Sequence, residues 1–122
     1  FNSTYIGMKT SGCITLKAGE TIMFTNKRYI TCGISSAIPD EIQLGLWIMI
    51  DNLRTSTNIE VDYLQVFRLS NQDGRQKITH SQEKPEYRNE ILIAVICQPV
   101  DNAKIFVIDD GRHSTMMLAE EY

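Results

Sequence analysis

The sequence lacks most of the features that would assign it to a broad functional class. Its longest apolar run, 91–97, has the length of a β-strand and is far too short to span a bilayer. Its seven glycines are dispersed, so it has no glycine-rich phosphate-binding loop. Segment 1–20 has no apolar stretch behind a basic start, unlike a secretory signal. We therefore expect a cytoplasmic protein without a membrane segment.

Cysteine and excess positive charge are also scarce. The three cysteines, Cys13, Cys32 and Cys97, form no Cys-x-x-Cys pair and are odd in number, which indicates free thiols in a reducing compartment. Nothing in the sequence places one of them beside a base, so a nucleophilic role is disfavoured. With 12 Lys and Arg against 15 Asp and Glu, the net charge is −3, which argues against nucleic acid as a partner. No cofactor motif is present, and we expect no cofactor.

The regular pattern of a folded domain begins near Met23. Residues 1–22 show weak alternation and no helical period. Ala18–Glu20 can be encoded by GCAGGAGAA, which contains the bacterial ribosome-binding sequence AGGAG at the customary distance before an ATG for Met23. We interpret residues 1–22 as a translated leader or disordered extension, whose removal leaves stability and binding intact, and 23–122 as a single domain. The alternative is that a short strand over Gly12–Lys17 belongs to the domain.

Hydrophobic periodicity predicts one main helix, over 37–57. Pro39 suits the first turn of a helix, and the acidic Asp40 and Glu41 favour its positive end. The apolar positions that repeat at helical spacing are Ile42, Leu46, Met49, Ile50 and Leu53. Strands are predicted over 26–34, 59–70, 75–82 and 88–97, followed by a hairpin over 103–122. The order β-α-β-β-β-β-β predicts an α+β fold, with a mostly antiparallel sheet of about five to six strands and the helix packed on one face.

Two of the predicted strands differ clearly in polarity. The strand over 75–82 is polar, which indicates an edge or solvent-facing position, and Pro85 ends it. Its segment Gln76–Gln82 is therefore a candidate docking site for an added strand. The strand over 88–97 is almost continuously apolar, which favours the centre of the sheet.

The outer side of the predicted helix is the most informative feature. On a helical wheel, Leu44, Trp47 and Ile48 fall away from the core stripe, although the outer face of a helix on a single sheet should be polar. One interpretation is that the helix is covered on both sides. The other is a contact with protein, either a partner or a second copy in a homodimer, because exposed apolar patches mark interfaces.

A metal-dependent hydrolase or nuclease is the alternative from a different class. Asp109, Asp110, His80 and His113 carry the side chains that a divalent metal or an acid–base pair requires. The spacing is not that of a metal motif, however, and the two aspartates before Gly111 are also typical of a hairpin turn. We therefore favour a non-enzymatic protein-binding or self-associating module over an enzyme.

Several phrases of the sequence carry a family resemblance. These phrases are FTNKRYIT, IPDEIQLGLWIMID, VDYLQVF, QKITHSQEKPEY and AKIFVIDDGRHSTMMLAEEY. Together they resemble a small staphylococcal-type family of proteins of unknown function, found in Gram-positive bacteria and their phages. The resemblance covers about Met23–Tyr122 and leaves residues 1–22 outside. It implies no activity and assigns no site residues.

Overall fold

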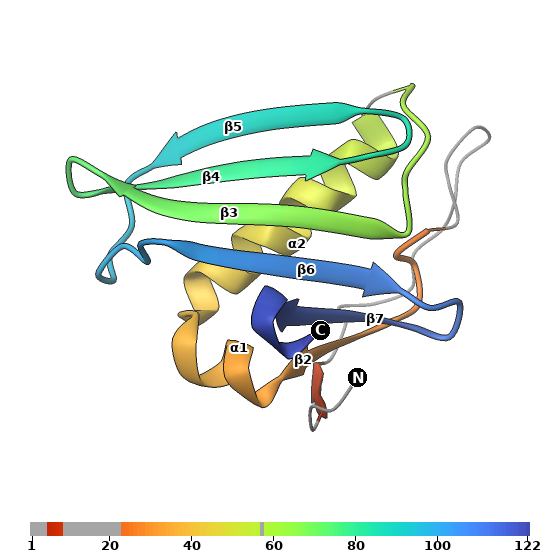
Figure 1. The fold of residues 1–122 in the computed structure, drawn as a ribbon, viewed down its shortest axis with the longest axis horizontal. Helices are drawn as coiled ribbons and strands as arrows, with labels where there is room; N and C mark the ends of the chain where they lie inside the picture. The colour runs from red at the N-terminus through yellow and green to blue at the C-terminus, as the bar shows by residue number, and fades with distance from the viewer. Residues whose placement is uncertain (1–4, 9–22, 57) are drawn as a thin grey trace.

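The computed structural model describes residues 5–8, 23–56 and 58–122 (Figure 1). Its strands are β1 (Tyr5–Met8), β2 (Lys27–Thr31), β3 (Leu64–Gln72), β4 (Arg75–Gln82), β5 (Tyr87–Ile93), β6 (Ala103–Asp109) and β7 (His113–Leu118). Its helices are α1 (Cys32–Ala37), α2 (Asp40–Ser56) and the short 3-10 helix η1 (Ala119–Glu121). None of these helices is long and apolar enough to cross a membrane.

The seven strands form one sheet in the order β1-β2-β7-β6-β3-β4-β5. All neighbouring strands are antiparallel except β2 and β7, which are parallel. Helix α2 lies diagonally across one face of the sheet (Figure 1). The predicted α+β class, with a mostly antiparallel sheet and one main helix on one face, is therefore confirmed.

The core lies between α2 and the sheet. The predicted apolar stripe of α2 is buried, and Ile42, Leu46 and Ile50 are fully inaccessible. The sheet contributes the buried side chains Phe67, Leu69, Ile78, Ile105, Val107 and Met116. Burying each large apolar side chain stabilises the fold by about 1.5–3 kcal/mol, which makes this layer the main stabilising contact.

The α-helix α1 was not predicted from the sequence, nor was the short η1. The strand expected over 26–34 ends at Thr31, and α1 follows it directly. The Thr31 hydroxyl accepts a hydrogen bond from the Ile34 backbone N–H at 3.3 Å, so Thr31 is the N-cap that begins the helix. The same hydroxyl donates to the Glu121 carboxylate at 2.6 Å, which ties this cap to η1.

The edge position expected for one of the two contrasting strands and the central position expected for the other are wrong. The polar β4 lies between β3 and β5, so it is an interior strand and Gln76–Gln82 offers no free edge. The strand expected at the centre over 88–97 is the last strand of the sheet: β5 ends at Ile93, and residues 94–97 lie in the loop that follows. The end position in the described sheet therefore belongs to β5 and not to β4.

The N-terminal segment is described only in part. Strand β1 lies within the segment interpreted as a leader, and it pairs with β2 in antiparallel register, with Ile6 opposite Ile30. The strand considered over Gly12–Lys17 lies outside the described residues.

Candidate functional site

The four candidate metal ligands do not converge. Asp109, Asp110 and His113 lie at the β6–β7 turn, whereas His80 lies within β4. The Asp109 carboxylate accepts hydrogen bonds from the Phe24 backbone N–H at 2.8 Å and from two further groups, and Asp110 caps the turn and contacts His113 at 3.2 Å. In the part of the chain that the structure describes, no three His, Cys, Asp or Glu side chains form a metal-binding group.

His80 is a structural histidine in the core. Its ring stacks on Phe67 with centroids 4.4 Å apart, and its Nε2 lies 2.6 Å from the Gln65 side-chain oxygen. Because that oxygen only accepts, Nε2 carries the proton of the neutral ring. Burial lowers the pKa of His80 to about 4, so the ring is neutral at pH 7.

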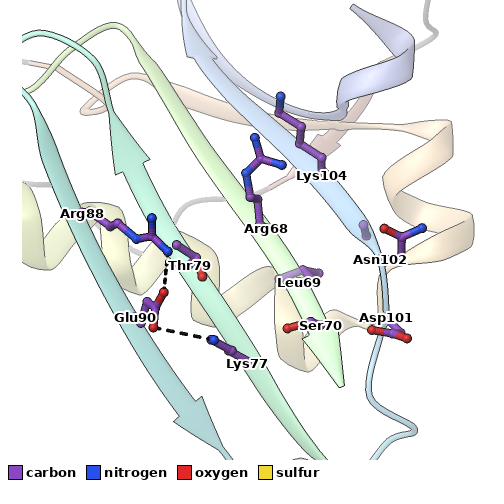
Figure 2. Close-up of a pocket in the computed structure, with 11 residues that line it drawn as sticks. Arg68, Leu69, Ser70, Lys77, Thr79, Arg88, Glu90, Asp101, Asn102 and Lys104 are labelled. Atoms are coloured by element: carbon purple, nitrogen blue, oxygen red, sulfur yellow. Dashed lines mark hydrogen bonds and ion pairs between the residues drawn. The ribbon is translucent and has the colours of Figure 1, made fainter. Parts of the chain in front are cut away.

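A polar hollow of about 670 Å³ lies on the face of the sheet opposite α2 (Figure 2). Glu90 is paired there with Arg88 at 2.6 Å and with Lys77 at 3.7 Å. Arg68 and Lys104 are direct neighbours on adjacent strands and expose two like charges. The hollow can attract anions, but within the described residues none of its hydroxyls is hydrogen-bonded to a neighbouring base, as a nucleophile would need.

The predicted exposure of Trp47 is wrong. Its side chain is only 3% exposed, and the Arg28 guanidinium lies over the ring with its central carbon 4.8 Å from the ring centroid. Arg28 is held in place by an ion pair with Asp51 and by a hydrogen bond to the Phe24 carbonyl. Trp47 therefore belongs to the core and cannot contact a partner directly.

Leu44 and Ile48 are exposed, as the sequence predicts, at 61% and 48%. Together with Glu41 and Asn52 they repeat every three or four residues and form one stripe along α2. The Glu41 carboxylate accepts hydrogen bonds from the backbone N–H of Ile96, at 3.1 Å, and from the thiol of the next residue, in the loop that follows β5. The stripe therefore runs along the β5 side of the molecule.

The thiol bound by Glu41 is that of Cys97. Partial burial, together with the hydrogen bond and negative charge of Glu41, raises its pKa. A raised pKa keeps the thiol protonated at neutral pH, so Cys97 is a poor nucleophile.

An apolar groove of about 330 Å³ separates α2 from β5. Its walls are formed by Gly45, Ile48, Met49, Asn52, Leu53, Tyr87, Asn89, Ile91 and Ile93. A Cβ atom placed on Gly45 would meet no atom within 4 Å, so no packing contact within the described chain requires glycine there. Glycine inside a helix costs about 0.5–1 kcal/mol relative to alanine, and at this position it leaves the helix backbone open to the groove.

The exposed apolar side chains gather at this edge. Of six large hydrophobic residues that are exposed in the described chain, four lie on α2, on β5 or in the following loop: Leu44, Ile48, Leu92 and Ile96. Ile96 is 98% exposed. Strand β5 is also an end strand, so the backbone groups on its outer side have no strand neighbour within the described sheet. We call these four residues, the groove and β5 the β5 edge surface.

Sequence reasoning found the helical half of this surface and missed the strand half. Leu44 and Ile48 follow from helical spacing, which is a local property. The position of β5 depends on which strands pair, and the apolar run over 91–97 is typical of a central strand although only its first three residues belong to β5. The break predicted at Pro85 is confirmed, since β4 ends at Gln82 and β5 begins at Tyr87.

Comparison with known proteins identifies a family and a fold. A family model described as staphylococcal protein of unknown function (DUF960) matches residues 27–121, which confirms the resemblance seen in the sequence. The crystal structure of a protein of unknown function from Enterococcus faecalis is similar, with a TM-score of 0.70 and 24% sequence identity over 88% of this chain and 98% of that chain. At this identity the likeness shows the fold alone. No curated protein matches the chain.

Proposed function

This chain belongs to the family described as staphylococcal protein of unknown function, and we propose that it acts as a non-enzymatic module that associates with protein through the β5 edge surface. The proposal rests on one observation: exposed apolar side chains and an end strand lie together at one edge of the described sheet. Exposed aliphatic side chains of α2 lie beside an end strand that has no strand neighbour on its outer side within the described sheet. Addition of a strand would satisfy the backbone while its side chains cover the aliphatics.

The clustering distinguishes this surface from ordinary exposure. Single apolar residues scattered over a surface are normal and need no explanation. Here most of the large exposed hydrophobic residues of the described chain share one edge, next to a groove with apolar walls. Exposed apolar side chains of α2 beside such a groove favour a site of association.

The compartment in which the module acts is part of the proposal. Cys97 is a free thiol. Free thiols suit the reducing bacterial cytoplasm, where disulfides are rare. We therefore place the association in the cytoplasm.

Substitution of the exposed aliphatics tests the proposal. We expect Leu44→Glu and Ile48→Glu to weaken association at least about tenfold, because each change places a charge in the contact. Both side chains are exposed, so the free energy of unfolding should change by no more than about 0.5 kcal/mol. Tyr63→Glu is the matched control, since Tyr63 is 54% exposed and lies outside the β5 edge surface.

Two measurements give the readout. Sedimentation equilibrium of the purified protein reports self-association. Capture from native cells, followed by titration of the purified captured protein, reports any other partner. If both helix variants behave like Tyr63→Glu in both measurements, the β5 edge surface is not an interface.

A further inference from the structure

We propose that the occupant of the β5 edge surface is a second copy of this chain, whose β5 pairs antiparallel with β5 in a register centred on Asn89. The proposal rests on the proposed function and names its partner. Pairing in this way joins two seven-stranded sheets into one continuous sheet and leaves neither β5 edge open.

The side chains of β5 are complementary to themselves in this register. In a two-fold antiparallel pair centred on Asn89, Arg88 faces Glu90 of the second copy, and Glu90 faces Arg88 of the second copy. On the other face, Tyr87 lies opposite Ile91 of the second copy, an aromatic against a β-branched side chain. A centre on Glu90 or on Arg88 would instead place that residue against its own copy, with like charges opposed.

The arrangement of β5 fits this pairing on both faces of the sheet. Arg88 and Glu90 point into the polar hollow on the face of the sheet opposite α2 (Figure 2). The Arg88 side chain is 69% exposed, and its ion pair with Glu90 uses one of its terminal nitrogens. The remaining donors of the guanidinium are thus available to a carboxylate across the two-fold axis.

The α2 face supplies the apolar part of the contact. Tyr87 and Ile91 line the groove beside Ile48, so the pair that they form across the axis continues this apolar surface. The open backbone at Gly45 allows close approach of a neighbouring element. This accounts for a helix-interior glycine that serves no packing contact within the described chain.

Charge reversal tests the register directly. We expect Arg88→Glu to weaken dimerisation at least about tenfold at low salt, because the symmetry creates two facing carboxylate pairs. The double variant Arg88→Glu with Glu90→Arg restores opposite charges across the axis, and its dimerisation constant should return to within about threefold of the original. Arg112→Glu, at the exposed β6–β7 turn, is the control for the change in net charge. Sedimentation velocity over a range of concentrations measures each constant.

A cysteine at the symmetry axis supplies an independent readout. In this register Asn89 faces Asn89 of the second copy, with the Cα atoms close enough for a disulfide. We expect Asn89→Cys to form a covalent dimer under mild oxidation, with the 89–89 link identified by peptide mapping. Arg75→Cys, on the exposed end of β4, should form far less.

Three outcomes would overturn the register. They are a monomer at every concentration, a dimer that Arg88→Glu leaves intact, and a double variant that remains as weak as the single one. If the protein is monomeric while Ile48→Glu abolishes binding to another captured protein, only the second-copy proposal fails. If Ile48→Glu changes neither self-association nor binding to a captured protein, both the second-copy proposal and the proposed function fail.

Discussion

Strands β4 and β5 lie side by side over seven residue pairs, yet β4 buries polar side chains and β5 exposes apolar ones. The polar β4 is interior and must satisfy buried amides and an imidazole. Strand β5, which ends in three aliphatic residues, is at the edge: Leu92 is exposed, and no strand of the described sheet lies on its outer side. The mean polarity of these two strands therefore does not determine their places in the sheet. What matters is whether each polar group finds a partner.

Buried glutamines of β4 act as anchors for irregular segments. The Gln82 amide donates to the carbonyls of Glu60 and Pro85, at 2.8 and 2.9 Å, and its oxygen accepts from the backbone N–H of Asp62 at 3.0 Å. Gln76 holds Val100 in a similar way, with 2.9 and 2.7 Å contacts to its backbone carbonyl and N–H. These side chains replace the strand partners that loop backbone lacks, which is why a polar strand can be buried.

Substitution of one buried glutamine of β4 should give the largest difference in stability between variants of β4 and β5. We expect Gln82→Ala to lower the free energy of unfolding by about 3 kcal/mol, because several buried groups lose their partners at once. On β5, Asn89→Ala is the counterpart at an exposed position and should cost no more than about 0.5 kcal/mol. Urea unfolding measures both variants. Equal costs would mean that the interior and edge positions do not differ energetically.

The buried imidazole of His80 in β4 should make the free energy of unfolding depend on pH. The folded pKa of His80 is about 4, against 6.5 for an exposed histidine, so the unfolded chain binds more protons between these values. Stability should therefore fall as pH falls from 6.5 to 4. The 2.5-unit difference corresponds to a loss of about 3 kcal/mol at most.

Comparison with His80→Gln isolates this contribution. Both proteins carry the same carboxylates, so the difference between their unfolding free energies removes the common acid titration. We expect that difference to shift in favour of His80→Gln as the pH is lowered from 7.5 to 4. Parallel stability curves would contradict a neutral, buried His80.

A smaller effect is expected where the groove meets α2. Gly45→Ala should raise the free energy of unfolding of the monomer by about 0.5–1 kcal/mol, because the new methyl group meets no atom and helix propensity improves. The same methyl group should weaken association by occupying space that a partner needs. Thermal unfolding of the dilute protein and sedimentation at high concentration separate the two effects. If Gly45→Ala is stabilised and associates like the original protein, Gly45 does not lie in the interface.

Local features of the fold were predictable from the sequence, and features that depend on pairing were not. The main helix and the hairpin turns at Gly74 and Gly111, both at positive φ, follow from short-range spacing and turn chemistry. The N-cap at Thr31 was a readable signal for α1, but Gly33 and two serines give that segment weak helix propensity. Trp47 was misplaced because a cation from β2, far away in the sequence, covers its ring.

The central claim, that β5 is the edge at which this protein associates, is tested most directly by amide hydrogen exchange at low and high protein concentration. The amides on the outer side of β5 are expected to exchange quickly in dilute protein and to become protected as the concentration rises. The amides of β4, which already pair on both sides, should exchange equally slowly at both concentrations. Unchanged exchange along β5, in a protein whose mass rises with concentration, would contradict the claim.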